Sequence, residues 1–359
     1  MPKTVKTVLK ILAVLIAAVL IFAVLFIGWL TVTEFNPEQN KTVPVEINGC
    51  LEPEKDVLDK TLRVLTFNMG YANLGKESDF FMDGGKNVRN GDEELVLKNL
   101  DGIIETLHDA DADIIFLQEV DVESARSFNV GERSIIKKEF EGYRTAWASN
   151  YVCDFVPFPW PPIGKVSSGI LTLSDLNMVV GKRVALPCPF NWPVSAANLK
   201  RCLLVTYTEI EGTDKQLVTV NLHLEAYDDG EGKIAQTKML WELLEAEYAN
   251  GNYVIAGGDF NQMFPGTEVI YPITTAELWE PGALEESVLP EGWQYVCDSE
   301  NPTCRLLNQP YDPASNNTQF YVIDGFIISP NVELVSVETV DAEFEFSDHN
   351  PVVMEVILK

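Results

Sequence analysis

The chain has 359 residues and a formal net charge of −28, from 54 acidic and 26 basic residues, with only three histidines. Such an acidic surface suits an exported domain and argues against tight nonspecific binding of nucleic acid, which depends on a basic surface. It does not exclude an enzyme that contacts a phosphate through a metal ion.

The N-terminal segment predicts a membrane anchor. Residues 11–32 carry no charged side chain, and as a helix this run is long enough to cross the hydrocarbon core of a bilayer. Lysines precede the run and the first acidic residue after it is Glu34, so the positive-inside rule predicts a cytoplasmic tail at residues 1–10 and an extracellular remainder. We therefore expect a single-pass protein of the cell membrane. A cleaved secretory signal is the alternative, although the apolar run is longer than most signal cores and no small-residue cleavage site follows it.

The remainder divides into a linker and one large domain. Residues 33–61 are polar and contain prolines, which predicts an extracellular linker, and residues 62–359 show no further linker and no internal repeat. Six cysteines would lie outside the cell, where disulfides are stable. Cys297 and Cys304 are the expected local loop closure. The absence of a CxxC pair argues against metal binding by thiols.

Hydrophobic periodicity predicts many strands and two long helices in this domain. The helices are expected at residues 93–110 and 232–248, each with an apolar stripe at helical spacing. The strands are expected at residues 61–70, 111–120, 143–149, 167–174, 252–261, 320–329 and 350–358, with a hairpin at 202–226. So many strands with so few helices favour a β-sandwich flanked by helices over a wound βαβ sheet.

Polar residues recur where these apolar runs end. A single carboxylate or amide in such a place is usually a cap or a turn former, but Glu and His are poor turn residues. If these strand ends face one another, they form an anionic pocket that holds two imidazoles. The residues are Asn68, Glu119, His223, Asp259, Asn261, Asp324, Asp348 and His349.

Such a pocket suits hydrolysis of a phosphodiester. Carboxylates without thiols favour a hard cation, with Mg²⁺ expected and Mn²⁺ or Ca²⁺ as alternatives. A histidine that is held by a carboxylate through one ring nitrogen can act on the proton of a water with the other. His349 fits this role, with Asp324 as its expected partner. The amides of Asn68 and Asn261 can hold phosphate oxygens without adding negative charge.

Six short motifs, in this order, resemble the endonuclease/exonuclease/phosphatase superfamily, which includes deoxyribonuclease I, the inositol-polyphosphate 5-phosphatases and the neutral sphingomyelinases. Each motif is weak alone, but all six follow an expected strand, and together they span about residues 62–358. The resemblance implies a four-layered α/β/β/α sandwich of the α/β (α+β) class and metal-dependent cleavage of a P–O bond. The motifs are "FN" (67–68), "LQEV" (117–120), "NLHL" (221–224), "GGDFN" (257–261), "VIDGFIIS" (322–329) and "SDHNPVV" (347–353).

The resemblance also implies a role for each matching residue. Glu119 matches the principal metal ligand, Asn68 the amide beside metal and phosphate, and Asp348 the aspartate on the metal side. His223 matches the histidine that supports the phosphate. Asp259 and Asn261 match the pair that orients water and binds the scissile phosphate. Asp324 and His349 match the carboxylate–histidine pair at the water.

Two departures from the family pattern stand out. Many relatives carry "LSR" after the strand that begins "SG", whereas this chain ends "GILTLSD" at Asp175, so we expect a cation near the substrate to be missing. Deoxyribonuclease I gives its first histidine a glutamate partner, and no such residue is identifiable for His223. The corresponding loop is rich in proline and aromatic residues between Phe155 and Pro162. A rigid packed loop and a lip that faces substrate or membrane are both open.

The sequence predicts a metal-dependent phosphoric ester hydrolase but not its substrate. Extracellular nucleic acid, a phospholipid head group as in sphingomyelinases, and a small phosphate ester remain alternatives. A catalytically inactive ectodomain that binds a partner is the rival from another class, but it would be expected to lack part of the site. The membrane is the predicted partner of the N-terminal helix, and no stable protein partner is predicted.

Overall fold

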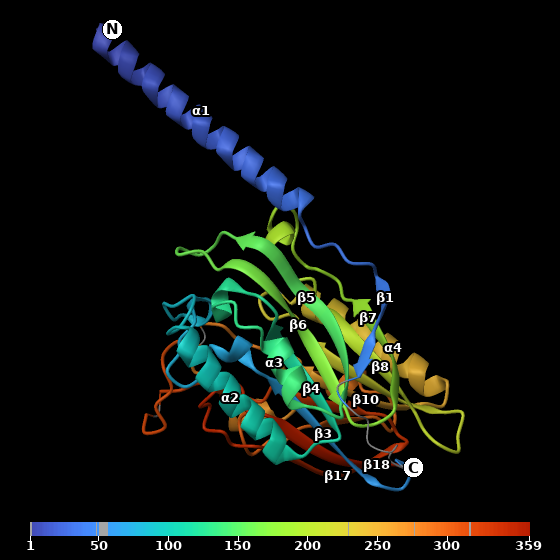
Figure 1. Ribbon diagram of the computed structural model, residues 1–359. Helices are drawn as coiled ribbons and strands as arrows, with labels where there is room; N and C mark the ends of the chain where they lie inside the picture. The colour runs from blue at the N-terminus through green and yellow to red at the C-terminus, as the bar shows by residue number, and fades with distance from the viewer. Residues whose placement is uncertain (1, 48, 50–56, 229, 276, 316) are drawn as a thin grey trace.

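The computed structural model describes residues 2–47, 49, 57–228, 230–275, 277–315 and 317–359. Its domain is a sandwich of two seven-stranded sheets with helices on both outer faces, as Figure 1 shows. This is the predicted four-layered fold. The first sheet has the order β1 (Asn40–Val43), β7 (Met178–Ala185), β8 (Cys202–Glu209), β9 (Gln216–His223), β10 (Tyr253–Asp259), β16 (Asp324–Ile328) and β13 (Gln294–Val296).

The second sheet carries the remaining long strands, and four short strands form two small pairs beside the sandwich. The second sheet has the order β17 (Val332–Thr339), β18 (Val352–Leu358), β3 (Thr61–Asn68), β4 (Ile114–Asp121), β6 (Gly164–Ser174), β5 (Arg144–Val156) and β2 (Val45–Ile47). The small pairs are β11 (Gln262–Met263) with β12 (Gly282–Ala283), and β14 (Cys304–Arg305) with β15 (Phe320–Tyr321).

The helices cover the two outer faces. α2 (Glu93–Ala110) and the short α3 (Glu132–Glu139) pack on the second sheet, and α4 (Glu231–Ala249) packs on the first. α2 coincides with the predicted helix, and α4 extends the other prediction by one residue at each end. α3 was not predicted, because its eight residues are too few to show a helical period clearly. A single turn, α5 (Thr267–Ile270), follows β11.

The core between the sheets is mostly apolar but contains buried polar side chains, among them an amide bridge. Phe116 of β4 and Phe326 of β16 belong to the apolar cluster that joins the two sheets. Near the end of β4, Gln118 Nε2 donates to Asn221 Oδ1 across the sandwich at 2.9 Å. Asn221 Nδ2 donates in turn to the carbonyl oxygens of Leu117 and Leu171. The two sheets are therefore in fixed register where the strands reach the predicted site.

The segment expected to be a linker contributes to both sheets. β1 pairs antiparallel with β7 and β2 pairs antiparallel with β5, so residues 40–47 cross from one sheet edge to the other. Residues 40–47, which we predicted to be part of a linker, are thus paired into the folded domain. These strands are short and partly polar, which leaves too little periodicity to detect in the sequence. The edge strands β7 and β5 supply the partners.

The N-terminal helix α1 (Lys3–Val32) ends where the apolar run ends but begins eight residues earlier. It projects from the domain in Figure 1. It is the one helix in the described residues that is long and apolar enough to cross a membrane, by length and composition. Only its last turns contact the domain: Leu30 and Phe26 pack with Tyr151 and Val156 of β5.

The expected loop closure between two cysteines is wrong. Cys297 and Cys304 are free, as are the other cysteines in the described residues, while Cys50 lies outside them. Cys297 packs against the apolar cluster under α4, whereas Cys304 is buried in a separate cluster beside β14. The two side chains therefore pack in two different apolar clusters.

Candidate active site

The strand ends that carry the predicted residues meet at one edge of the sandwich. Asn68 ends β3, His223 ends β9 and Asp259 ends β10, while Asp324 begins β16. Asp259 is the register partner of both His223 and Asp324, so these three residues form one row across three adjacent strands. The row exists because β10 runs parallel to β9 and antiparallel to β16.

One carboxylate oxygen lies at the centre of the site. Asp259 Oδ2 accepts a hydrogen bond from Asn68 Nδ2 at 3.0 Å and lies 3.4 Å from His223 Nε2. The same oxygen is 3.9 Å from His349 Nε2 and 3.4 Å from Asn261 Nδ2. The other oxygen, Oδ1, accepts from the backbone N–H of Asn261. Four predicted residues from four separate parts of the chain thus surround a single atom.

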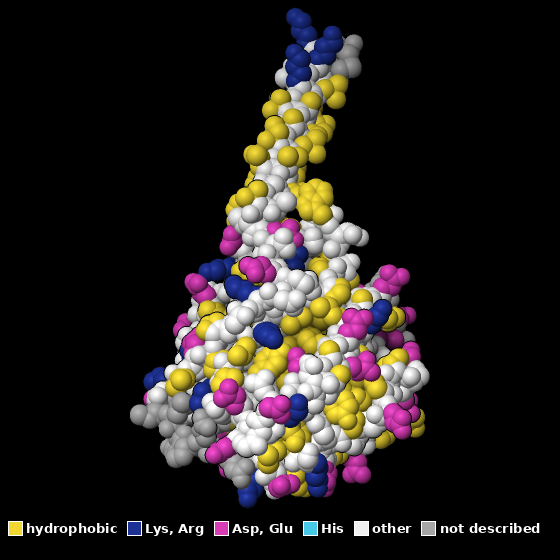
Figure 2. All heavy atoms as spheres, turned by 90° about the vertical axis from the view of Figure 1, so that its right-hand side faces the viewer, with side chains coloured by type: hydrophobic (Ala, Val, Ile, Leu, Met, Phe, Trp, Pro, Cys, Tyr) yellow, Lys and Arg dark blue, Asp and Glu magenta, His cyan; other side chains and the backbone are white. Residues whose placement is uncertain are grey.

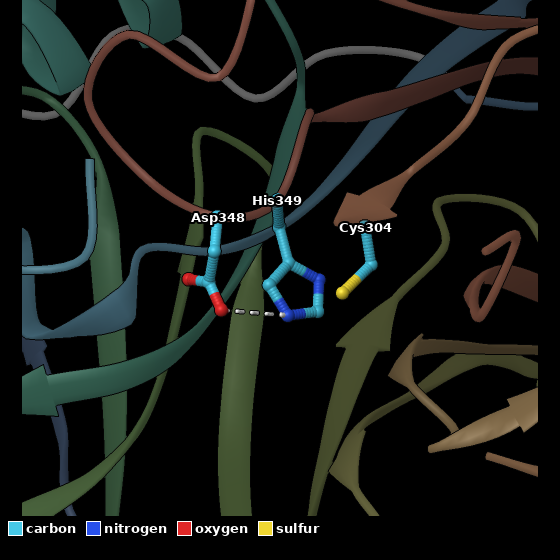
Figure 3. A group of neighbouring side chains, drawn as sticks. All are labelled: Cys304, Asp348 and His349. Carbon is cyan, nitrogen blue, oxygen red and sulfur yellow. Dashed lines mark ion pairs between the residues drawn. The ribbon is translucent and has the colours of Figure 1, made fainter. Parts of the chain in front are cut away.

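His349 and Asp324 form the predicted pair. His349 Nδ1 lies 2.8 Å from Asp324 Oδ2, and both residues are buried. Burial lowers the pKa of His349, but the Asp324 carboxylate opposes this effect, and the pKa is raised well above its usual range. Nε2 lies 3.5 Å from Asn68 Nδ2 and faces Asp348 Oδ2 at 3.9 Å (Figure 3). Figure 3 also shows the Cys304 thiol beside the ring, and burial raises the pKa of this thiol to about 12. Cys304 is therefore a neutral neighbour.

His223 is buried and neutral. Burial and the Arg201 guanidinium lower its pKa well below the usual histidine range. Arg201 donates to the His223 carbonyl oxygen and pairs with the buried Glu225 at 3.3 Å. Within the described residues, His223 Nδ1 has no hydrogen-bond partner. Glu225 thus lies near His223 in the sequence but forms an ion pair with Arg201. It is therefore not the glutamate partner of the His223 imidazole.

The predicted oxygen ligands for a cation are Glu119, Asp348 and Asn68, and Asp348 Oδ2 lies 3.9 Å from His349 Nε2. Glu119 and Asp348 interact electrostatically, and burial together with the Glu119 charge raises the pKa of Asp348 to about 6. Asn68 Oδ1 accepts from the N–H of Gly70, whose own backbone passes close to Asp348 Oδ1. The raised pKa of Asp348 indicates that its negative charge is not fully compensated, and carboxylate and amide oxygens are the ligands that Mg²⁺ prefers. These side chains therefore fit a hard divalent cation.

Two of the predicted residues adopt a left-handed backbone conformation. Glu119 has φ +54° and Asn261 has φ +50°. Glu119 sits at an irregularity in the pairing of β4 with β6, between Leu117 and Val120. Such conformations are costly for residues with a side chain and gather at functional sites, where the surrounding structure holds them. The bulge turns Glu119 out of the strand's alternation and towards Asp348.

Arg126 is a cation that sequence reasoning missed. It binds Asp121 through Nε and Nη2, its Nη1 lies 3.6 Å from Glu119 Oε2, and it stacks 3.8 Å above the Tyr71 ring. A guanidinium therefore lies beside Glu119, while the expectation that the cation of the "LSR" position is missing stays a prediction. Asp175 follows Ser174, which pairs with Ile114 at the far end of β4, so that position is remote from Glu119. Arg126 reaches the site from a short loop, and no motif marks it.

Asp83 and Tyr227 were also missed. Tyr227 Oη donates to Asp83 Oδ1 at 3.1 Å, and the N–H of Leu307 donates to Asp83 Oδ2. Burial and the charge of Asp348 raise the pKa of Asp83 to about 7. We call the sandwich edge that carries Asp259, Asp324 and His349 the catalytic edge, after its predicted role, and the Asp83–Tyr227 pair lies beside it. A turn aspartate in a loop and a tyrosine shortly after a strand carry no distinctive sequence signal.

Comparison with known proteins identifies the family. The sequence model described as the Endonuclease/Exonuclease/phosphatase family matches residues 65–349. The chain belongs to this family. Members of the family are metal-dependent phosphoester hydrolases, so the chain is an enzyme of this class, as predicted. The rival interpretation as an inactive binding ectodomain receives no support.

Solved structures share the fold at low sequence identity. An endonuclease/exonuclease/phosphatase from Beutenbergia cavernae is 18% identical, with a TM-score of 0.55, and the match covers 83% of this chain and 72% of that chain. A family member from Bacteroides vulgatus is 17% identical over 84% of this chain and 100% of that chain, with a TM-score of 0.52. TDP2 from Caenorhabditis elegans is 16% identical, with a TM-score of 0.50 and coverage of 84% and 77%. No curated protein matches the sequence.

The raised pKa of Asp83 predicts how stability depends on pH. Because the folded protein favours the protonated carboxyl, the contribution of Asp83 is complete below about pH 4 and is lost as pH rises through about 7. Asp83→Asn removes this loss, worth on the order of 2 kcal/mol. In chelator, Tm of Asp83→Asn should fall less than that of wild type between pH 5 and 8. The exposed Asp101→Asn is the control, and equal slopes for wild type and Asp83→Asn would contradict the assignment.

Proposed function

We propose that this protein is a membrane-anchored, extracellular phosphodiester hydrolase in which the His349–Asp324 pair activates water. The observation that carries the proposal is the convergence of Asn68, His223, Asn261 and His349 on Asp259 Oδ2. Apart from Asn261, these residues are far apart in sequence and each comes from a different strand end or loop. Their meeting is what a phosphoryl-transfer site requires and what structural turn chemistry does not explain.

The residues would have three roles: binding the cation, binding the phosphate and transferring the proton of water. Glu119, Asp348 and Asn68 would hold the cation, with Mg²⁺ expected and Mn²⁺ or Ca²⁺ as alternatives. When bound, such a cation neutralises charge that develops on the phosphoryl oxygens. Asn68, Asn261 and His223 would bind the phosphate, and the unpartnered Nδ1 of the buried His223 offers a polar atom for a ligand to satisfy.

The proton path follows from the distances. Asp324 fixes the ring of His349 through Nδ1, so Nε2 faces Asp259 Oδ2 across 3.9 Å, a gap that one water can bridge. The raised pKa of His349 favours the imidazolium, whereas the neutral ring, with its Nδ1–H donated to Asp324, is the form that acts as the base. The water oxygen forms a bond to phosphorus while its proton passes to the free Nε2 of this neutral ring. The P–O bond to the leaving alkoxide breaks, the alkoxide takes up a proton from solvent, and Nε2 releases its own proton to solvent. Asp259, which burial and Asp324 give a pKa of about 7, orients the water from the opposite side.

Removal of His349 tests this mechanism. General acid–base catalysis is worth about 10²–10⁴-fold, so His349→Ala should lower kcat on bis(p-nitrophenyl) phosphate by about 10³-fold, and Asp324→Asn by less. EDTA should abolish hydrolysis and added Mg²⁺ should restore it. His108→Ala is the matched control, because His108 stacks on Phe140 at the end of α2, away from the site. Hydrolysis that persists in chelator, or full activity of His349→Ala, would refute the mechanism.

The anchor and its orientation rest on α1. The helix has 30 residues with a mean hydropathy of 3.2 in its most apolar window, and none of that window is buried against the domain. Figure 2 shows apolar side chains along its length and basic side chains gathered at its far end. Lys3, Lys6 and Lys10 are these basic residues and favour a cytoplasmic N-terminus. The catalytic domain would then lie outside the cell.

Protease protection tests the orientation. Proteinase K added to intact expressing cells should remove a C-terminal epitope tag on the full chain and leave an N-terminal tag intact. Both tags should be lost after lysis. A C-terminal tag that is protected until lysis would reverse the proposed topology, and release of the domain into the medium would indicate a cleaved signal instead.

A phospholipid head-group hydrolase is a second candidate function, and the surface beside α1 favours it. We call this surface the aromatic edge: it comprises Phe158 and Trp160, from the loop between β5 and β6, and Trp192, with exposed fractions of 69%, 90% and 63%. The edge is attached to the anchor, because Phe155 packs on Phe26 and Trp192 Nε1 donates to Thr31 Oγ1. Exposed aromatic residues beside a membrane helix are typical of the bilayer interface.

The net charge favours the same candidate over nucleic acid. A nuclease that follows a polyanion normally presents a basic surface, whereas this chain has a net charge of −28. The Arg126 guanidinium near the site is already paired with the Asp121 carboxylate and so offers little positive charge to a polyanion. Nucleic acid remains the alternative substrate, and the generic phosphodiester assay does not depend on which is correct.

Loss of the aromatic edge should separate membrane substrate from soluble substrate. The double variant Phe158→Ser, Trp160→Ser removes interfacial apolar area, so hydrolysis of sphingomyelin vesicles should fall about tenfold relative to hydrolysis of bis(p-nitrophenyl) phosphate. Val335→Ser, an exposed apolar position on β17, is the control. An unchanged ratio would show that the aromatic edge does not contact lipid.

A further inference from the structure

A cavity of about 460 Å³ opens beside the catalytic edge. Its wall includes Tyr227, four residues after His223, together with Met82 and Gly84, which flank Asp83. The hydrogen bond from Tyr227 Oη to Asp83 Oδ1 ties this wall to a carboxylate that interacts with Asp348. Tyr227 also interacts electrostatically with Glu119 and Asp348, so a substrate whose phosphate is held at the proposed site would have this cavity available for the group next to the phosphate.

Two aromatic rings of the cavity are held in fixed positions. Trp279 Nε1 donates to the carbonyl oxygen of Ala226 at 2.9 Å, and the rings of Trp279 and Tyr227 lie 6.2 Å apart at an angle of 56°. Phe81 adds a third ring and touches Phe158 of the aromatic edge at 6.0 Å between centroids. Aromatic faces carry negative potential and attract cations, most strongly from tryptophan.

The charged residues of the cavity, like its aromatic rings, favour a cation over an anion. Among its described lining residues are three carboxylates, Asp228, Glu277 and Glu280, and one ammonium, Lys233. Lys233 Nζ is buried against the Ala226 carbonyl and Asp228 Oδ1, so its charge is matched by Asp228. Glu277 and Glu280 are exposed and leave the cavity net negative. The next phosphate of a nucleic acid would be repelled here, whereas a cation would be attracted.

We propose that this cavity binds the quaternary ammonium group of a choline-type phosphodiester. The proposal rests on the phosphodiester hydrolase function proposed above and names its substrate class. A quaternary ammonium is weakly hydrated and cannot donate hydrogen bonds, so aromatic faces with carboxylates nearby suit it better than they suit a strongly hydrated primary ammonium. The connection from Phe81 to Phe158 places the cavity next to the surface that would face lipid.

A matched pair of soluble esters tests the cavity. The full chain in dodecyl maltoside micelles with Mg²⁺ is given p-nitrophenyl phosphorylcholine and its neutral isostere, p-nitrophenyl 3,3-dimethylbutyl phosphate. Both have the same leaving group and shape and differ in one positive charge. We expect kcat/KM to be about tenfold higher for the choline ester.

Substitutions in the cavity test whether its residues cause the preference for the choline ester. Trp279→Ala and Glu280→Gln should each reduce the ratio of the two kcat/KM values, whereas Trp279→Phe, which keeps an aromatic face but loses the hydrogen bond to Ala226, should keep most of it. Glu105→Gln, exposed on α2, should leave the ratio unchanged. A ratio near one in the wild type, or a ratio that Trp279→Ala does not alter, would overturn the proposal.

Two further substrates separate this failure from others. If thymidine 5′-(p-nitrophenyl phosphate) is preferred over both esters, the cavity accepts a nucleoside and the quaternary ammonium assignment is wrong. If bis(p-nitrophenyl) phosphate and all other esters are left intact, the proposed hydrolase function fails. If bis(p-nitrophenyl) phosphate is cleaved but the choline ester is not preferred, only the cavity assignment fails.

Discussion

The register of three strands is the constraint on which the site depends. β10 pairs with β9 on one side and with β16 on the other, and this places Asp259 directly between His223 and Asp324. The close approach requires glycine at position 258, where φ is +151° and a Cβ would lie 1.9 Å from the Leu222 carbonyl oxygen. A slip of one residue would turn Asp259 to the other face of the sheet. The "GGD" sequence is thus explained by backbone contact before any chemistry is considered.

The site keeps more negative charge than its buried surroundings easily stabilise. The pKa values of Asp259 and Asp348 are raised to about 7 and 6, which means that the folded protein resists their ionisation. The strands nevertheless hold these carboxylates in place, because the apolar core and the Gln118–Asn221 bridge fix the two sheets just beneath them. The rigid sandwich supplies the stability, and the edge is where a cation and a phosphate would offset the repulsion.

The residues at strand ends could be predicted from the sequence because two signals coincide there. A buried apolar run in the sequence indicates each strand. A carboxylate, amide or imidazole at the end of so many strands is not explained by turn formation and therefore indicates a shared site. Arg126 and Asp83 could not be predicted in this way, because each reaches the site from a loop whose path depends on distant contacts, with Glu119 and Leu307 respectively. The strands at residues 40–47 were missed for a related reason: they exist only because β7 and β5 offer them edges.

The arrangement of aromatic residues connects the anchor with the chemistry. Phe26 of α1 packs on Phe155, the loop that follows presents Phe158, and Phe158 touches Phe81 at the cavity beside Asp83. Two aromatic contacts, joined by the short segment from Phe155 to Phe158, thus link the end of α1 to the cavity beside the Tyr227–Asp83 pair. A nuclease would need a basic path for a polyanion in this position. An apolar path is what a substrate that remains partly in a bilayer would follow, because its chain stays in contact with apolar side chains while its phosphate reaches Asp259.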